Sequence, residues 1–226
     1  NQGLYNKAEL DRNGDDLTDI IDDACGDLPY LNITKVAGTP LAVGDGTYDI
    51  SYTVTVVSVG GVGTNYDLSD TPKFDDDVII NSGGFSGQNS GSMNLTSGVS
   101  TTLATNQSIG ASPSEHTYTV MFNVTLDLED VIGDNEYEPC SPVCNPDGEN
   151  SGLLNAASLT YEGNTTEACD CEDLPYLKVT KVAGTPVALG DGTYDISYTV
   201  TVVSVGGVGT NYDLSDTPKF DDDVII

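Results

Sequence analysis

Apolar and polar residues alternate with a period of two along several stretches of this chain. The two clearest stretches place apolar side chains on one face at Tyr48, Ile50, Tyr52, Val54 and Val56, and at Tyr118, Val120, Phe122, Val124, Leu126 and Leu128. A period of two is typical of a β-strand with one buried and one solvated face. No stretch sustains a helical period over three turns, so the pattern predicts an all-β protein.

Turn-forming residues separate the alternating stretches. Glycine-rich sequences that favour tight turns occur at 44–47, 60–63, 82–87 and 146–152. Strands are expected near residues 30–37, 47–59, 63–70, 76–81, 92–96, 99–105, 116–128 and 153–161. Short strands joined by such turns predict a two-sheet antiparallel β-sandwich.

A long internal repeat organises the chain. Residues 27–80 return as residues 173–226 with four differences, which are Asn32 to Lys178, Ile33 to Val179, Leu41 to Val187 and Val43 to Leu189. A shorter similarity relates GLYNKAEL at 3–10 to GLLNAASL at 152–159. A fixed period of this size is typical of an array of like domains.

The repeat divides the chain into three expected parts. Residues 1–26 are expected to be the terminal strand and linker of a preceding repeat, residues 27–172 a complete β-sandwich repeat, and residues 173–226 the N-terminal half of the next repeat. A half sandwich leaves its inner face uncovered, which a soluble monomer does not keep. We therefore expect further strands to complete residues 173–226, from a continuing chain or from another molecule.

The order of these motifs resembles a known family. TKV is followed by GDGTYDISYTVTV, a glycine-rich turn, TNYDLSDTP, HTYTVMFNVTL and LLNAASL. This order is similar to that of the immunoglobulin-like tandem-repeat domains of bacterial and archaeal surface proteins, a family long catalogued as of unknown function. The resemblance implies tandem immunoglobulin-like sandwiches in stalks, adhesin shafts or fibres, and it implies no enzyme. The insert EYEPCSPVC and a longer middle section depart from the family pattern.

The composition is strongly acidic. Thirty-six Asp and Glu against seven Lys and Arg give a formal net charge of −29, which repels nucleic acid and anionic membrane surfaces and attracts cations. No apolar run reaches the roughly 20 residues that span a bilayer, and the first residues lack the order of a signal peptide. The cysteines and many Asn-x-Ser/Thr triplets favour an extracellular or cell-surface location. The single histidine, His116, is expected to be an ordinary strand-end residue.

The acidic segment DRNGDDLTDIIDDAC at 11–25 has the ligand spacing of a calcium loop. Oxygen ligands that follow this spacing are Asp11, Asn13, Asp15, the Leu17 carbonyl, Asp19 and Asp22. The segment resembles the calcium loops of thrombospondin type-three repeats, including the trailing cysteine, but Asp16 replaces their preferred glycine. Calcium is the expected cofactor, and a solvated acidic linker is the alternative. The DDD runs at 75–77 and 221–223 are expected to lie in solvated loops.

Strand phase directs three polar residues toward the predicted core. Lys35 shares a face with Leu31 and Ile33, Asp70 shares one with Leu68, and Asn155 lies on the apolar face of LLNAASL. Buried polar groups are costly unless they satisfy one another. Either the three residues form a hydrogen-bonded cluster, or Lys35 has condensed with Asn155 into an isopeptide crosslink with Asp70 as the proton shuttle, as in similar surface domains. Misassigned strand phase is the third interpretation.

Four cysteines belong to the complete repeat. Cys140, Cys144, Cys169 and Cys171 allow three pairings, and neighbours as close as Cys169 and Cys171 pair only with strain. We expect Cys140, Cys144 or both to bridge to the pair at 169 and 171, which would staple the terminal strand to the preceding loop. A thiolate metal site is the alternative. Cys25 corresponds to Cys171, and its partner is expected outside this sequence.

Five Asn-x-Ser/Thr sequons are candidate glycosylation sites. They begin at Asn32, Asn94, Asn106, Asn123 and Asn164. Strand phase directs Asn32 and Asn123 to the outer faces of their strands, where a glycan would stand in solvent.

Two hypotheses about function follow. The first is a structural, non-enzymatic segment of an extracellular fibre, filament or stalk, because a shaft gains from every added repeat. Its partners would be copies of itself or continuing repeats, with donor-strand complementation as one route. The second is an adhesin or glycan-binding module, in which loops between residues 82 and 115 present the ligand site.

Overall fold

The computed structural model describes the chain in two compact units, residues 1–174 and 175–226. The described residues, to which all structural statements refer, are 3–14, 18, 20–127, 137–140, 151–206, 209–221 and 223. They form strands, turns and irregular segments without any helix, so the predicted all-β class is confirmed. The described residues contain no helix that is long and apolar enough to cross a membrane.

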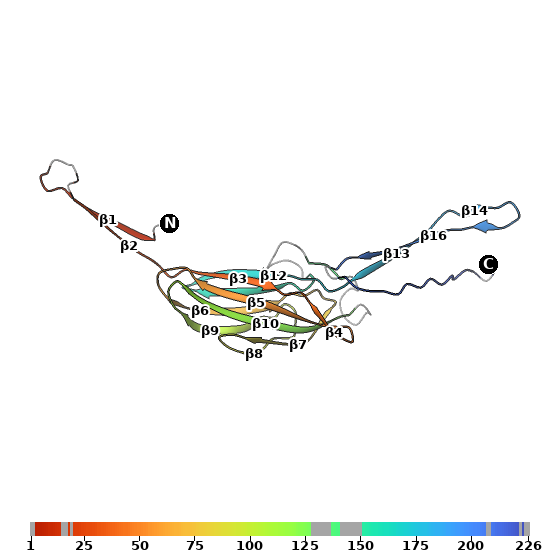
Figure 1. Ribbon diagram of the computed structural model, residues 1–226, viewed down its shortest axis with the longest axis horizontal. Coiled ribbons are helices and arrows are strands. Elements are labelled where there is room, and N and C mark those ends of the chain that lie inside the picture. Colours follow the sequence, from red (N-terminus) through yellow and green to blue (C-terminus); the bar gives the residue numbers. More distant parts are fainter. Residues whose placement is uncertain are drawn as a thin grey trace. The chain divides into compact units, whose positions relative to one another are not determined.

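The first sheet of the first unit has six antiparallel strands. Along the sheet these are β3 (Leu31–Ala37), β5 (Thr47–Ser58), β10 (Ser114–Leu126), β7 (Val78–Ser86) and β8 (Gly91–Ser92), with β4 (Leu41–Gly44) also paired to β5. The long strands β5 and β10 lie side by side at its centre (Figure 1).

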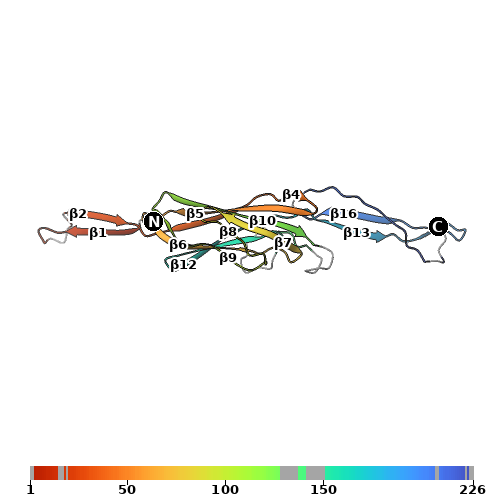
Figure 2. The ribbon, with the colours of Figure 1, turned by 90° about the horizontal axis from the view of Figure 1, so that it is seen from below.

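A second antiparallel sheet packs against the first. Its four strands are, in order, β12 (Asn164–Asp170), β11 (Asn155–Tyr161), β6 (Thr64–Pro72) and β9 (Thr101–Ile109). Hydrogen bonds join the two layers: the Tyr52 hydroxyl donates to the Leu153 carbonyl, and the hydroxyls of Tyr66 and Tyr118 lie 2.8 Å apart. The unit is therefore a two-layer, sandwich-like β fold, seen from a second direction in Figure 2.

The core follows the predicted alternation. Tyr52, Val54, Tyr118 and Val120 are buried, while the residues between them on each strand are exposed or half-buried. Aromatic rings fill the centre, with the centroids of Phe74 and Phe122 5.1 Å apart in an edge-on arrangement. Each such side chain contributes about 1.5–3 kcal/mol when it leaves water, so the alternating strands carry most of the driving force for this fold.

Some strands were not expected from the sequence. The strand predicted near 92–96 is reduced to the two residues of β8, and β4 and β12 were not predicted. β12 contains few apolar residues, and only its pairing with β11 makes it a strand. Edge strands of this kind carry a weak local signal because one side of the strand is solvated.

Residues 3–26 form a hairpin instead of one strand and a linker. β1 (Leu4–Leu10) pairs with β2 (Ile20–Gly26), and all residues of both strands are exposed. Among the described residues, these two strands pair only with each other.

The second unit has short antiparallel pairs and no buried residue among those described. β13 (Leu177–Ala183) pairs with β16 (Tyr198–Ser204), and β14 (Val187–Ala188) pairs with β15 (Tyr194–Asp195). Residues 209–221 are not assigned to a strand. Apolar side chains that are counterparts of core residues in the first unit are exposed here, Tyr198 by 40% and Ile196 by 41%.

Candidate crosslinking site

Lys35 extends from β3 into the space between the two sheets. It lies on the same face as the buried residue Leu31, and its side chain is completely buried. Strand phase therefore assigned this lysine to the correct face. A buried ammonium group is costly unless a partner compensates its charge or the amine loses its proton.

Asp70 on β6 is the direct partner of Lys35. The Lys35 Nζ donates to the Asp70 Oδ2, and both side chains are completely buried. The same Nζ lies 5.1 Å from the centre of the Tyr52 ring. The other carboxylate oxygen of Asp70, Oδ1, is buried and accepts no hydrogen bond from the part of the chain that the structure describes.

Asn155 on β11 faces the same space. β11 pairs with β6 in a register that sets Ala157 opposite Asp70 and Asn155 opposite Pro72. Because residues two apart on a strand share a face, Asn155 is the diagonal neighbour of Asp70. Asn155 is fully buried, and neither its Nδ2 nor its Oδ1 has a hydrogen-bond partner among the described residues.

The burial of all three residues excludes a misassigned strand phase. It also differs from a satisfied hydrogen-bonded cluster, since the amide of Asn155 and one oxygen of Asp70 lack hydrogen bonds. Each unsatisfied buried polar group costs about 1–3 kcal/mol. The arrangement is thus unfavourable as three separate side chains.

Burial brings the pKa values of the amine and the carboxyl toward each other. It lowers the pKa of Lys35 below its ordinary 10.5, although the nearby Asp70 opposes this shift. It raises the pKa of Asp70 above its ordinary 3.8, against the opposing effect of the nearby Lys35. These shifts favour the uncharged form of the pair, with a neutral Lys35 amine and a protonated Asp70 carboxyl group. Nucleophilic attack by a lysine requires the neutral amine.

This arrangement can form an amide between two side chains. The neutral Lys35 Nζ would attack the Asn155 Cγ while the Asp70 carboxylic acid protonates the amide oxygen. Asp70 would then carry a proton from the attacking Lys35 nitrogen to the amide nitrogen of Asn155. As the C=O bond re-forms, the oxygen returns its proton to Asp70 and the amide nitrogen leaves as ammonia. One C–N bond forms, one breaks, and no oxidant or cofactor is needed.

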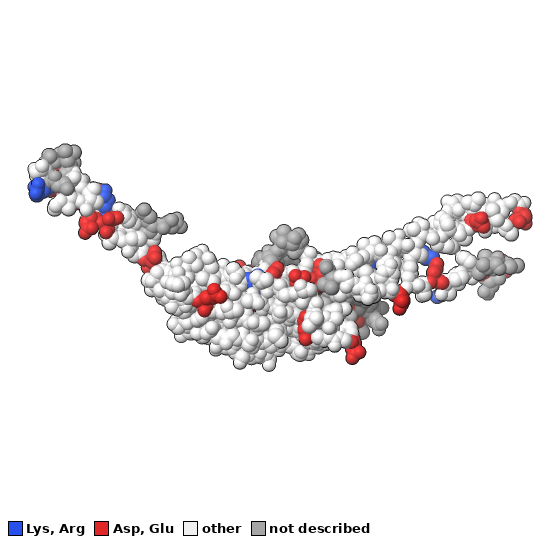
Figure 3. Space-filling view, viewed as in Figure 1, with Lys and Arg blue, Asp and Glu red and all other residues white. Residues whose placement is uncertain are grey.

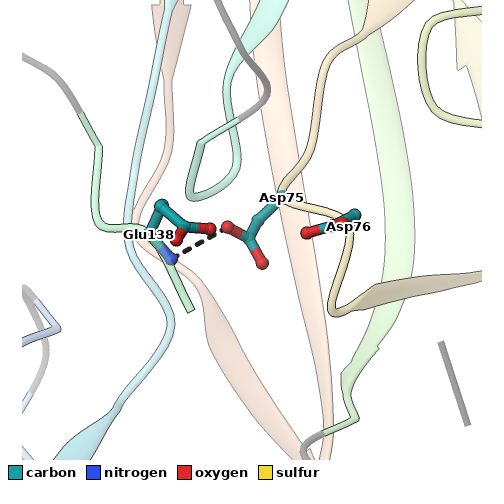
Figure 4. A group of neighbouring side chains, drawn as sticks. All are labelled: Asp75, Asp76 and Glu138. Carbon is teal, nitrogen blue, oxygen red and sulfur yellow. Dashed lines mark hydrogen bonds between the residues drawn. The ribbon is translucent and has the colours of Figure 1, made fainter. Parts of the chain in front are cut away.

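A second polar cluster lies where β6 leads into β7. The carboxylate oxygens of Asp75, Asp76 and Glu138 lie within 4.8 Å of one another (Figure 4). Asp75 accepts hydrogen bonds from the backbone N–H of Asp77 at 3.0 Å and of Glu138 at 2.9 Å. Burial is the main cause of a raised pKa at Asp75. The expectation of a solvated loop at 75–77 is wrong for Asp75 and Asp77, which are buried because backbone groups distant in sequence surround them.

The structure contains one of the predicted disulfide bonds. Cys140 and Cys171 are bonded, with their Cα atoms 6.0 Å apart. Cys169 is also in a disulfide, and Cys144 lies outside the described residues. Disulfide bonding at Cys140 and Cys171 excludes them as thiolate metal ligands. Cys25 is exposed on β2.

The predicted calcium ligands are only partly described. Asp15, Leu17 and Asp19 lie outside the described residues. The Oδ1 of Asp11 accepts hydrogen bonds from the backbone N–H of Asn13 at 3.1 Å and of Gly14 at 2.8 Å. Asp22 is exposed within β2. Calcium binding by this segment stays a prediction.

The predicted glycosylation sites lie at the surface. Those that are exposed are Asn32, Asn94, Asn106 and Asn164. Asn123 is half-buried, and its Nδ2 donates to Asp49 at 2.7 Å. Glycosylation at each site stays a prediction.

One polar contact between the sheets was not predicted. His116 was expected to be an ordinary strand-end residue, but its Nδ1 lies 2.8 Å from the Tyr66 hydroxyl, which also contacts the Tyr118 hydroxyl. Burial lowers the pKa of His116 below 6.5. Because β6 and β10 belong to different sheets, pairing across the sandwich had to be known to find this contact.

Acidic side chains are spread over the face of the molecule in Figure 3, where basic ones are few.

No protein-family model, curated protein or solved structure matches this chain. The candidate function therefore rests on the cluster of Lys35, Asp70 and Asn155 and on the repeat that carries it.

Proposed function

We propose that this chain is a structural, non-enzymatic segment of an extracellular fibre or stalk, built from tandem immunoglobulin-like β-sandwich repeats of the bacterial or archaeal surface type. In this proposal an isopeptide bond between Lys35 and Asn155 staples the first unit, with Asp70 as the proton shuttle. The observation that carries it is a buried asparagine amide without hydrogen bonds beside a buried lysine and carboxyl pair.

Covalent condensation explains this otherwise unfavourable cluster. Loss of ammonia removes the two N–H donors that Asn155 leaves unsatisfied and converts the buried amine into a neutral amide. The energetic cost of three separate polar groups is then replaced by one covalent bond. A binding or catalytic site would need access to solvent or substrate, which completely buried side chains do not have.

The positions of the two linked strands suit a load-bearing element. β3 is the first strand of the sandwich in sequence and β11 is among the last. Force that enters through residues before Lys35 would pass through the bond directly to Asn155. The strands between them would carry no load and would stay folded. The disulfide between Cys140 and Cys171 closes a second loop, which contains β11 and β12.

The near identity of residues 27–80 and 173–226 supports a repetitive shaft. A shaft needs the same mechanical unit many times, whereas a dedicated ligand site does not need to recur. The high negative charge keeps such an extended chain soluble and favours binding of cations such as calcium along it.

Intact-mass measurement of the denatured and reduced monomer, produced in a host that adds no N-linked glycans, tests the crosslink. We expect a mass lower than the sequence mass by one molecule of ammonia. Asn155→Ala and Lys35→Met should each have the full mass calculated for the variant, while Asn32→Ala, on the outer face of β3, should keep the loss. An unmodified wild-type chain that is correctly folded would refute the proposal.

The fibre itself is tested by electron microscopy of native material. Filaments with an axial repeat of one sandwich domain are expected. Isolated globular particles without such a repeat would contradict the structural role.

A binding role is the second candidate, and one surface feature favours it. A hollow of about 570 Å³ lies against the first sheet, between residues of β4, β5, β7 and β10, among them Leu41, Asp49, Gly84 and Met121. This volume is within the range of small-molecule sites. Screening of the intact chain against glycans, with Asp49→Ala as the matched variant, tests this role. If no glycan binds, or if Asp49→Ala binds glycans as tightly as the wild type, the binding role is excluded.

A further inference from the structure

The components of the crosslinking site occur a second time on this chain, in separate places. Lys181, Asp216 and Tyr198 in the second unit are the counterparts of Lys35, Asp70 and Tyr52 in the repeat. The Lys181 Nζ donates to the Asp216 Oδ1 and lies 4.8 Å from the centre of the Tyr198 ring. The same pair therefore forms, but its side chains are 40% and 54% exposed.

The counterpart of Asn155 is Asn6, on the hairpin β1–β2. Asn155 is opposite Asp170, the residue directly before Cys171, and Asn6 is opposite Ala24, the residue directly before Cys25. The two hairpins therefore have the same register relative to the following cysteine. The hairpin β1–β2 is in this respect a second β11–β12.

The glycine that precedes each hairpin gives independent support for this equivalence. Gly3 and Gly152 both have left-handed backbone angles, with φ of 57° and 46°. A Cβ atom at Gly3 would lie 2.6 Å from the Oδ1 of Asp27, and one at Gly152 would lie 2.8 Å from the Oδ1 of Asp173. The same close packing thus surrounds both hairpins.

The hairpin exposes the residues that its counterpart buries. Leu153 and Leu159 are completely buried in the first unit, whereas the corresponding Leu4 and Leu10 are 55% and 53% exposed. In the first unit, β11 pairs with β6 and contacts β3, and most of its residues are buried. Residues 210–218, the counterpart of β6, are exposed and not assigned to a strand in the second unit.

We propose that the hairpin β1–β2 of one copy docks on the second unit of another copy and becomes covalently attached there. β1 would pair with residues 210–218 as β11 pairs with β6, by strand addition. Lys181 would then condense with Asn6, with Asp216 as the proton shuttle. This inference rests on the crosslinking chemistry proposed for Lys35 and Asn155.

The reaction between copies balances as it does within the first unit. The Lys181 Nζ forms a bond to the Asn6 Cγ, the Cγ–Nδ2 bond breaks, and ammonia leaves with the proton that Asp216 transfers. Before docking, both side chains of the pair are exposed to water. Docking would bury the pair as Lys35 and Asp70 are buried, and the reaction would begin only in the assembled joint.

The joint would contain every reacting group. Lys35, Asp70 and Asn155 come from β3, β6 and β11 alone, and these three strands have counterparts in the second unit and the hairpin. The covalent bond would make the docked joint permanent.

The test is incubation of the purified chain at increasing concentration, followed by denaturing and reducing electrophoresis. We expect a ladder of covalent oligomers, with one molecule of ammonia lost at each joint and a linked peptide that contains Asn6 and Lys181. Lys181→Met and Asn6→Ala should each abolish the ladder, while Lys178→Met, on the same strand as Lys181, should keep it. Asn6 and Lys181 are exposed and Lys178 is half-buried, so none of the variants removes a buried side chain and all are expected to fold.

A mixture of the two inactive variants tests whether Asn6 and Lys181 react with each other across two copies. Lys181→Met still carries Asn6, and Asn6→Ala still carries Lys181, so their mixture should form covalent dimers and nothing larger. A wild-type chain that stays monomeric at all concentrations would overturn the inference. If the monomer has nevertheless lost the ammonia expected for Lys35 and Asn155, the proposed function stands and only the joint between copies fails.

Discussion

Single-molecule stretching offers the most direct test of a load-bearing crosslink. The perturbation is Asn155→Ala, which removes the amide that the Lys35 amine would attack and leaves the rest of β11 unchanged. The experiment is performed under reducing conditions, so that the bond between Cys140 and Cys171 does not shorten the chain.

The size of the effect follows from the positions of the two residues. About 120 residues separate Lys35 from Asn155, and an extended chain spans about 3.3–3.6 Å for each residue. The crosslink should therefore hide about 400 Å of contour length in the wild-type chain. Asn155→Ala should release this length when the first unit unfolds.

Matched variants separate the bond from ordinary folding stability. Lys35→Met should release the same extra length as Asn155→Ala, because either change prevents the bond. Asn32→Ala should behave as the wild type, since its side chain is on the exposed face of β3. Equal contour lengths in the wild type and in Asn155→Ala would refute the bond, whatever the unfolding force.

Three further predictions follow from the structure. The imidazole of His116, the only histidine, should titrate below 6.5 in NMR spectra because burial lowers its pKa. Between that lowered pKa and 6.5 the unfolded state binds more protons than the folded state, so the free energy of unfolding should fall as the pH drops through this window. A pKa of 6.5 or above in the folded protein would contradict this. Phe122→Ala should cost about 3–5 kcal/mol in urea unfolding, because Phe122 is buried against Phe74; a loss below 1 kcal/mol would contradict this packing. Calcium should bind the intact chain in calorimetry, and Asp11→Asn should weaken it while Asp67→Asn should not; equal binding by both variants would place the calcium elsewhere.

Several elements of the fold could be predicted because their signal is local. A strand with one buried face needs apolar residues at every second position, and β5 and β10 have them over most of their length. The same alternation fixed the directions of Lys35, Asp70 and Asn155, since each lies in phase with buried aliphatic residues. Phase is a property of one strand and needs no knowledge of its neighbours.

Other features could not be predicted because they depend on distant parts of the chain. Asp75 belongs to an acidic run typical of a solvated loop, but the backbone N–H of Glu138 satisfies its carboxylate. β12 is a strand because β11 offers a free edge, and its own composition does not indicate one. Local composition carries no information about which segment covers a loop or an edge.

Local sequence patterns encode the repeat, the all-β class and the face of each strand on which Lys35, Asp70 and Asn155 lie. Their meeting depends on the three-dimensional fold, because the register of β11 on β6 and the packing of β3 across the sandwich are contacts between distant segments. The second unit demonstrates the difference. Lys181 and Asp216 have nearly the same local sequence as Lys35 and Asp70, yet they are exposed. Burial, and with it the chemistry of an amine and a carboxyl group, depends on the strands that cover the pair.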